Sequence, residues 1–409
     1  MILVCLAKGS DFEAFKAELN KAGYVYTQGK ALTRFFCVET TQKEFTLSDY
    51  KDVILVEEDP VAELAAVDDP YFYTYDGISF QEQNPATYGR SWALARICRR
   101  KNPFPRSGYS PLDTFNTFFR QTRTGAGVDI YICDVGYAPH LATFEDRIAH
   151  VSPELTGGYQ DTSGSSHGVF VAACAAGKDF GVATGANIWF SPVGAGAAPS
   201  IMFTGMDNAL SHYLSRAGTN RPAVMNCSFG NNPPTLPTES VRIIASDIMD
   251  AGMPITAAAM NFSFDHDVYD IIPADAVDVI NVGGSAIHDT PMNWHRYGTS
   301  FGTQVTLFAP GEKIFVPHSE NMIDGFFLIN GTSFAAPFTA GVVACMLEGY
   351  QRPTTRTQVQ AINAKLIENS TKDVLDFPES SGIEIRGNNR LLYLDPNIAI
   401  EPITGLTPL

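Results

Sequence analysis

The chain reads GVDIYICDVG over residues 127–136, a short apolar run that closes on an acidic residue just before a glycine. Such a run, rich in β-branched and aromatic residues and bounded by turn formers, predicts a buried strand over residues 128–133. In a parallel sheet, ligands bind beyond the carboxyl ends of the strands, which is where Asp134 falls. An aspartate at a strand end is by itself more often a turn former. The segment alone is therefore stronger evidence for a sheet than for a functional site.

Short apolar strands alternate with helical stretches from Gly125 onward, a pattern typical of a parallel sheet covered by helices on both faces. Further strands are expected over residues 188–192, 223–226, 254–259, 279–283 and 305–308. Helices are expected over residues 167–176, 201–217, 239–251 and 333–350. Residues 125–409 are therefore predicted to form one large α/β domain.

The N-terminal residues 1–65 predict a separate small unit. Phe12, Phe15 and Leu19 recur at helical spacing between two apolar strands. We expect the order strand, helix, strand, strand, helix, strand, with the second helix over residues 42–50, which is a ferredoxin-like α+β arrangement. Residues 66–124, rich in aromatic residues and proline, are expected to form an arm and surface loops around a helical stretch at 91–99.

Composition and charge exclude several classes of partner. With 44 acidic and 28 basic residues the net charge is −16, and without a basic stripe no nucleic-acid partner is expected. No run of 18 apolar residues occurs, so no membrane partner is expected either.

The first residues lack a basic leader and a small-residue cleavage site, from which we expect a cytoplasmic or virion-associated protein rather than a classically secreted one. The seven cysteines have no metal-ligand spacing and are expected to be free, buried thiols in a reducing compartment.

Two further segments combine a chemically competent residue with small neighbours. The run SSHGVFVA at 165–172 puts His167 at the start of an apolar helix, and NGTSFAAPFTAG at 330–341 surrounds Ser333 with Gly, Ala and Pro. A lone histidine at a helix start is more often structural, and a serine there is commonly a cap. A plain cap, however, does not need small residues that let other backbone approach closely.

Together the three segments resemble the subtilase family of subtilisin-like serine proteases, especially its proteinase K-like members. Asp134, His167 and Ser333 match the family motifs in the family's chain order, at separations of 33 (167 − 134) and 166 (333 − 167) positions. The resemblance implies that these three residues form a catalytic triad and that Asn261, in the run AAAMN, completes the oxyanion hole. The implied fold is a subtilisin-like parallel sheet sandwiched by helices, preceded by a small ferredoxin-like prodomain.

The resemblance also covers substrate recognition. It implies that Ser228, Phe229 and Gly230, in the run NCSFG, bind the substrate backbone. Met260 stands where the family usually has a glycine that lines the specificity pocket, and Val135 replaces a threonine whose hydroxyl would support the carboxylate of Asp134.

Regulation follows from the N-terminal unit, because residues 1–65 resemble the family's inhibitor-type prodomain. The resemblance implies an autoregulated zymogen that cleaves itself within residues 62–68. The expected partners are protein or peptide substrates and the chain's own prodomain.

Acyl-transfer chemistry gives each triad member a role. A serine hydroxyl is a weak nucleophile unless a base takes its proton. His167 would be that base, and Asp134 would fix its tautomer. The backbone N–H of Ser333 and the Asn261 amide would stabilise the oxyanion. The implied function is a serine endopeptidase that requires no cofactor; Ca²⁺ is compatible with the family, but no residues are assigned to any metal.

The alternative is a structural or assembly component, for example in a virion, that keeps the fold with little or no turnover. The missing leader and the unusual neighbours Val135, Met260 and Phe334 favour this alternative.

Overall fold

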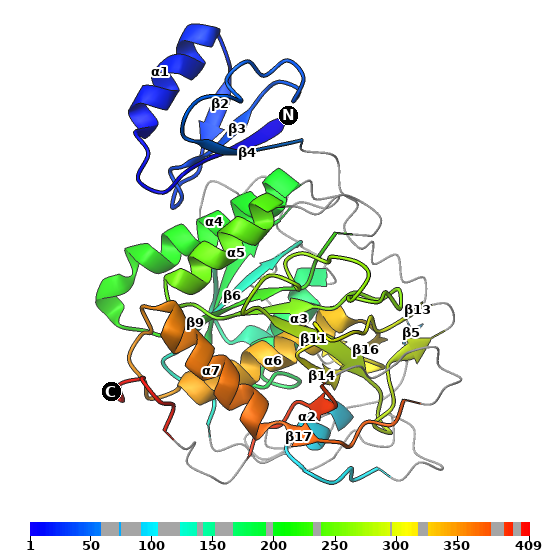
Figure 1. The fold of residues 1–409 in the computed structure, drawn as a ribbon. Coiled ribbons are helices and arrows are strands. Elements are labelled where there is room, and N and C mark those ends of the chain that lie inside the picture. Colours follow the sequence, from blue (N-terminus) through cyan, green and yellow to red (C-terminus); the bar gives the residue numbers. More distant parts are fainter. Residues whose placement is uncertain are drawn as a thin grey trace.

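The computed structural model describes residues 1–58, 73–74, 91–104, 123–136, 142–151, 167–193, 199–231, 239–294, 297–317, 326–377, 388–395 and 402–409. A large sheet with helices on both faces forms the main body, and a small unit built from the N-terminal residues lies against it (Figure 1). The predicted α/β class with a large parallel sheet is confirmed.

Nine strands form the large sheet in the order β17-β18-β14-β11-β10-β9-β6-β8-β7. All neighbouring strands are parallel except β17, which pairs antiparallel with β18. The strands are β6 (Asp129–Asp134), β7 (Ile148–His150), β8 (Asn187–Pro192), β9 (Ala223–Cys227), β10 (Ile255–Ala258), β11 (Ile280–Ser285), β14 (Leu307–Pro310), β17 (Thr371–Lys372) and β18 (Arg390–Leu391). The six predicted strands match β6, β8, β9, β10, β11 and β14 with boundary shifts of one or two residues.

Two layers of helices cover the sheet, each with its own apolar core. One layer contains α2 (Trp92–Ile97), α3 (His167–Ala176) and α6 (Thr332–Leu347), and the other contains α4 (Pro199–Ser215) and α5 (Glu239–Asp250). Every residue of α6 is buried, which is why its sequence shows no amphipathic period. None of the helices in the described ranges combines the length and hydropathy needed to cross a bilayer.

Helix α7 (Arg356–Asn369) packs beside α5 and was not predicted. Its N-cap, Thr355, accepts a hydrogen bond from Gln358 N–H, so the run Thr-x-x-Gln was an available helix signal. The remaining elements are short pairs of strands and single helical turns: β5 (Tyr73–Thr74), β12 (Asn293–Trp294), β13 (Tyr297–Gly298), β15 (Ile314–Pro317), β16 (Phe326–Ile329), η2 (Ala142–Phe144) and η4 (Ala217–Thr219).

The N-terminal unit is an antiparallel sheet in the order β2-β3-β1-β4 with one helix on it. Its elements are β1 (Ile2–Leu6), α1 (Phe12–Ala22), β2 (Tyr26–Gln28), β3 (Phe35–Val38) and β4 (Val53–Glu58). The second helix predicted over residues 42–50 is wrong, because turns occupy this segment. The Tyr24 hydroxyl bonds to Glu44 O and Thr46 N, which takes up backbone groups that a helix would pair internally.

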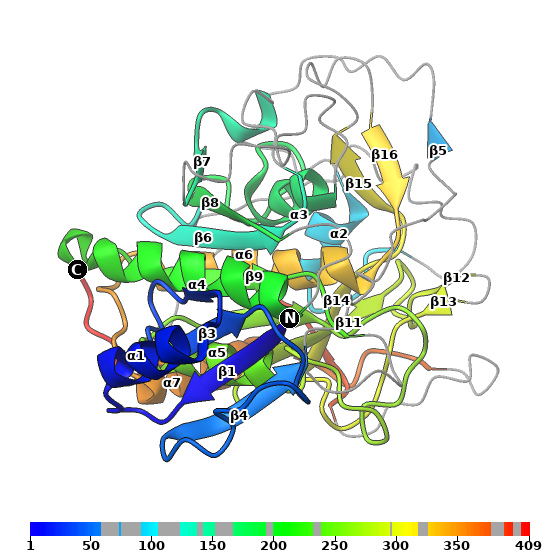
Figure 2. The same ribbon diagram turned by 90° about the horizontal axis from the view of Figure 1, so that it is seen from above.

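The N-terminal unit contacts the main body at α4 and α5, which lie side by side beneath it (Figure 2). Asp207 of α4 accepts hydrogen bonds from the backbone N–H groups of residues 30–32 at 2.6 to 3.3 Å. Glu57 of β4 accepts from Glu239 N and Ser240 N at 2.8 and 3.2 Å, at the start of α5. Carboxylates are favourable at such helix N-termini because the first N–H groups have no intrahelical partner.

Apolar and charged contacts complete the same interface. The Phe35 ring lies 4.4 Å from that of Phe203, and Arg34 forms an ion pair with Asp247 of α5. Both Arg34 and Asp247 are almost fully buried, so removing one of them would leave an unpaired charge, which typically costs about 3–5 kcal/mol. The interface therefore has an apolar centre and several directional polar contacts.

Candidate active site

The strand-end aspartate and the helix-start histidine lie in direct contact. His167, the first residue of α3, has its Nδ1 2.6 Å from Oδ1 of Asp134 at the end of β6. The helix approaches the strand this closely because Gly168 has no side chain, and a Cβ there would lie 2.5 Å from Val135 O. The side chains of Asp134 and His167 are 3% and 12% exposed, so the pair is largely removed from water.

The outer atoms of this pair make no hydrogen bond to any residue that the structure describes. His167 Nε2 and Asp134 Oδ2 are both buried and unpartnered there, while Asp134 Oδ1 also accepts from Val135 N at 2.7 Å. Val135 has no hydroxyl to offer to Oδ2. Buried polar atoms are normally paired, so an unpartnered imidazole nitrogen is typical of an atom that serves a reaction.

Ser333 lies in the first turn of α6. Its Oγ is 3.4 Å from Ser228 O, and the ring of the following residue, Phe334, lies 5.5 Å from the His167 ring. The hydroxyl therefore sits in the same region as the imidazole but bonds to a carbonyl rather than to His167 Nε2. Such serine–histidine bonds are often long in the absence of substrate and tighten when it binds.

Asn261 contacts the residue immediately before Ser333. Its Oδ1 accepts from Thr332 N at 2.8 Å and from the Thr332 hydroxyl at 3.0 Å. With Oδ1 anchored in this way, Nδ2 is left as the donor, beside Gly331 at the start of α6. The amide and the first N–H groups of α6 are thus neighbouring donors, as an oxyanion hole requires.

A buried chain of hydrogen bonds, which no sequence pattern predicts, supports the start of α6. Ser228 Oγ donates to Ser333 O at 2.7 Å and accepts from Asn226 Nδ2 at 2.9 Å. Thr256 Oγ1 donates in turn to Asn226 Oδ1 at 3.1 Å. The chain joins β9 and β10 to the helix that carries Ser333, so Ser228 supports Ser333 in addition to the substrate contact predicted for it.

Met260 and Gly230 face one another next to this region. Met260 has φ +73°, a left-handed conformation that a methionine rarely adopts and a glycine adopts freely. Its side chain is buried, and a Cβ on Gly230 would lie 3.2 Å from its Sδ. Phe229 is also buried in the core.

One cysteine next to the site is a weakly acidic thiol. All seven cysteines are free, and all but Cys37 are buried. Burial, with the adjacent Cys133 thiol as a smaller cause, raises the pKa of Cys227 well above its usual range. Cys227 directly precedes Ser228, and because a thiol with a raised pKa is a weak nucleophile, it does not compete with the Ser333 hydroxyl. Within the described ranges, no group of three or more His, Cys, Asp or Glu is arranged to hold a metal ion.

The sequence also contains a Gly-x-Ser-x-Gly run at 298–302, the pattern of an α/β-hydrolase nucleophile. Its structural context excludes that role. Ser300 is fully buried, its Oγ accepts from Phe264 N at 3.2 Å, and no helix follows it. Ser300 is therefore a structural residue.

A parallel sheet between helix layers, with Asp134, His167, Ser333 and Asn261 at its carboxyl edge, defines the subtilisin-like class of α/β proteins. The chain belongs to the Subtilase family, whose family model matches residues 100–382. Its fold is similar to that in "Crystal structure of a cold adapted subtilisin-like serine proteinase", with a TM-score of 0.57, 24% identity, and coverage of 74% of this chain and 97% of that one.

Curated relatives agree with this assignment. The chain is 30% identical to "Subtilisin-like protease 1" of Trichophyton verrucosum over 261 residues, which cover 63% of this chain and 59% of the relative. It is 27% identical to "Subtilisin-like proteinase Spm1" of Pyricularia oryzae over 360 residues, which cover 84% of this chain and 61% of the relative. The chain thus spans between 44% and 61% of the length of the curated relatives that it matches.

These relatives correct one expectation and weaken another. The expectation of a cytoplasmic or virion-associated protein is wrong, because the relatives are fungal subtilisin-like proteases, a class that is typically secreted. The alternative of a structural component is not favoured either, because the relatives are named as proteases.

Proposed function

We propose that the chain is a serine endopeptidase in which Ser333, His167 and Asp134 form the catalytic triad. The observation that carries the proposal is the 2.6 Å contact between His167 and Asp134 beside an unpartnered Nε2, close to a serine at a helix N-terminus. That combination supplies a positioned base, a nucleophile and a field that favours negative charge.

In the proposed reaction, Ser333 Oγ attacks the carbonyl carbon of the scissile peptide while its proton passes to His167 Nε2. Asp134 holds the Nδ1 proton and stabilises the imidazolium. The oxyanion that forms accepts hydrogen bonds from Ser333 N and Asn261 Nδ2. Collapse breaks the C–N bond, and the imidazolium gives its proton to the leaving amine. Water then hydrolyses the acyl-enzyme by the same steps in reverse order. All reacting groups belong to the chain, so no cofactor takes part in these steps.

Substrate side chains are proposed to enter between the segments that carry Gly230 and Met260, with Ser228, Phe229 and Gly230 offering backbone groups to the peptide. The packing of Met260 Sδ against Gly230 supports a shallow primary pocket, because the methionine fills space that a glycine would leave open. We therefore expect small or medium apolar side chains to be preferred.

The N-terminal unit is proposed to act as an inhibitory prodomain. Its contacts with α4 and α5, through Asp207, Glu57 and the Arg34–Asp247 pair, support stable docking on the main body. The proposed self-cleavage point within residues 62–68 lies outside the described residues.

The test is hydrolysis of casein by the purified chain and by the Ser333→Ala variant, each with and without a serine-directed inhibitor. The proposal expects cleavage by the wild type only, blocked by the inhibitor, together with loss of the N-terminal unit as seen by mass spectrometry. An intact, fully active wild-type chain would contradict the processing step, and equal hydrolysis by both chains would contradict the proposed nucleophile.

A further inference from the structure

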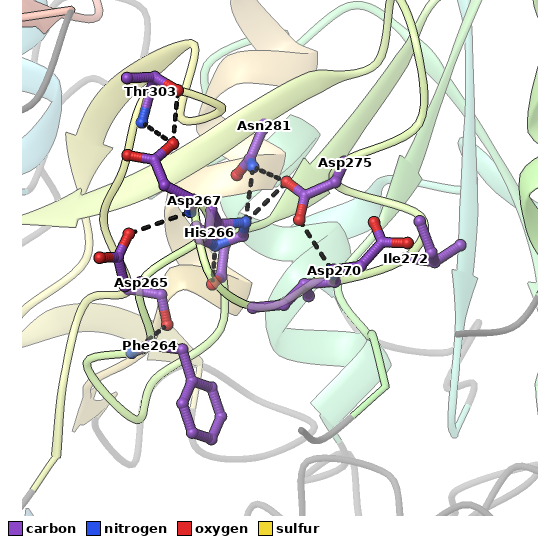
Figure 3. Close-up of polar contacts among 12 residues, drawn as sticks. Phe264, Asp265, His266, Asp267, Asp270, Ile272, Asp275, Asn281 and Thr303 are labelled. Atoms are coloured by element: carbon purple, nitrogen blue, oxygen red, sulfur yellow. Dashed lines mark hydrogen bonds and ion pairs between the residues drawn. The ribbon is translucent and has the colours of Figure 1, made fainter. Parts of the chain in front are cut away.

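His266 and Asp275 form a second histidine–aspartate pair (Figure 3). His266 Nδ1 is 2.6 Å from Asp275 Oδ1, and His266 Nε2 is 2.9 Å from the carbonyl oxygen of Ala259. The His266 side chain is 0% exposed and that of Asp275 is 5% exposed. The His266 ring is therefore more deeply buried than the His167 ring, which is 12% exposed.

The hydrogen-bond partners fix the orientation of this ring. Asp275 accepts from Ile271 N at 2.7 Å and from Asn281 Nδ2 at 2.9 Å, and Asn281 Nδ2 also lies 3.3 Å from His266 Nδ1. A carbonyl oxygen only accepts, so His266 Nε2 carries the proton that it donates to Ala259 O. The ring is thus held at Nδ1 and donates from Nε2.

The Ala259 carbonyl is the point at which this pair meets the site. Ala259 follows β10 directly and lies two residues before Asn261, with Met260 between them in its left-handed conformation. Ser300 N donates to Met260 O and Gly298 N donates to Asn261 O, each at 3.0 Å. Three successive carbonyls thus each accept a hydrogen bond, and the one on Ala259 accepts from the His266 ring.

We propose that His266, held by Asp275, is a positioning residue for the oxyanion donor Asn261. By fixing the Ala259 carbonyl, the His266 ring sets where the chain leaves β10 and therefore where Asn261 Nδ2 points. The inference rests on the proposed function, because it concerns stabilisation of the same oxyanion. Neither residue touches the substrate.

Figure 3 also shows why the loop can hold the ring in place. His266 N donates to Phe301 O at 2.8 Å, and Asp267 Oδ1 accepts from Thr303 N at 2.9 Å. The loop is thus anchored to the segment after β13, and Asn281 comes from β11, the neighbour of β10 in the sheet. His266 therefore links the end of β10 to the segment after β13 through its own backbone, and to β11 through Asp275.

The test is a double-mutant cycle between His266→Gln and Asn261→Ala, with kcat and KM normalised to titrated active sites. In the Asn261-containing chain, His266→Gln is expected to lower kcat roughly 10- to 100-fold with little change in KM, the scale of a catalytic group misplaced by up to about 1 Å. In the Asn261→Ala background, the same substitution is expected to lower kcat less than about 3-fold, because the group it positions is absent.

His212→Gln is the matched control. His212 is also a histidine with a hydrogen bond at Nδ1, to the Tyr131 hydroxyl at 2.9 Å, but it is far from β10 in the sequence and lies outside the site. It should leave kcat unchanged in both backgrounds. If His266→Gln does not fold, Asp275→Asn replaces it, because the amide keeps the shape of the side chain and removes its charge.

Equal losses from His266→Gln in both backgrounds would overturn the inference, because a merely structural role lowers activity whether or not Asn261 is present. Unchanged kcat in the single variant would overturn it as well. Failure of the proposed function is distinguishable, because in that case the wild type hydrolyses no substrate and Ser333 cannot be titrated.

Discussion

Two histidine–aspartate pairs lie among the described residues, and in both of them Nδ1 lies 2.6 Å from an aspartate oxygen, at His167 and at His266. The pairs differ at the other nitrogen. His167 Nε2 has no partner among the described residues, whereas His266 Nε2 bonds to the Ala259 carbonyl. An imidazole with an unpartnered nitrogen can accept a proton during a reaction, while one bonded to a carbonyl must keep its proton.

The comparison teaches that the aspartate alone does not give such a histidine its function. In both pairs the carboxylate orients the ring, and the group facing Nε2 decides between proton transfer and positioning. The backbone makes this difference, because His167 starts a helix at the carboxyl edge of the sheet and His266 lies in a loop folded under β10.

The largest expected effect separates the two histidines. His167→Ala should lower kcat roughly a million-fold, a scale that was established on a subtilisin, because the proposed base is removed. His266→Gln should lower kcat by no more than about 100-fold. Initial rates on a chromogenic peptide measure both, and similar losses from the two variants would break the comparison.

The next largest difference is expected between substitutions of the two aspartates. Asp134→Asn is expected to lower kcat roughly ten-thousand-fold, because the amide favours the wrong tautomer of the base. Asp275→Asn should lower kcat no more than about 100-fold, because Asp275 acts through His266, and it should also cost about 1–3 kcal/mol of stability, because a buried hydrogen bond to the ring is lost. Initial rates measure the first effect of this variant, and urea unfolding in the Ser333→Ala background measures the second. Stability unchanged by Asp275→Asn would argue against a stabilising contact between His266 and Asp275.

Met260 lies between the two pairs along the chain, and its replacement tests whether this segment also limits the substrate pocket. Met260→Gly is expected to raise the ratio of kcat/KM for phenylalanine over alanine substrates roughly tenfold, because the pocket beside Gly230 deepens. Met253→Ala, at another buried methionine, is the control and should leave the ratio unchanged. A ratio unaffected by Met260→Gly would show that Met260 does not limit the pocket.

Glu57 provides a contrast with both aspartates, because backbone N–H groups rather than an imidazole face its carboxylate. Burial raises the pKa of Glu57, against the opposing effect of its hydrogen bonds to Ser240 and Glu239. The folded chain then binds the proton more readily than the unfolded chain, so the contribution of Glu57 to stability falls as the pH rises through its folded-state pKa.

The wild type should therefore lose a small amount of stability relative to Glu57→Gln between about pH 4 and pH 7. Urea unfolding of both chains in the Ser333→Ala background measures the difference. If the wild type instead gains stability relative to Glu57→Gln as the pH rises, the hydrogen bonds of Glu57 affect its pKa more than burial does.

Sequence reasoning reached the central strands, the four main helices and the family, because each depends on a local pattern. The second helix of the N-terminal unit failed, since its apolar spacing did not reveal that Tyr24 would take its backbone groups. The triad and Asn261 remain predictions about chemistry, although the structure brings His167 into contact with Asp134 and Asn261 into contact with Thr332.

His266 could not be predicted in the same way. In the sequence it stands between Asp265 and Asp267, a pattern typical of a solvent-exposed loop. Its burial depends on the way in which β10, β11 and the loop close around it, and its partner Asp275 lies nine residues further along. Only the folded arrangement shows which atom each ring nitrogen faces.

The central claim is that Ser333 is a nucleophile activated by His167. A fluorophosphonate probe tests it most directly, with the labelled residue mapped by mass spectrometry after removal of the N-terminal unit. The account predicts an adduct on Ser333 in the wild type and in His212→Gln, and none in His167→Ala or Ser333→Ala. An adduct on another serine, or undiminished labelling of Ser333 without His167, would contradict it.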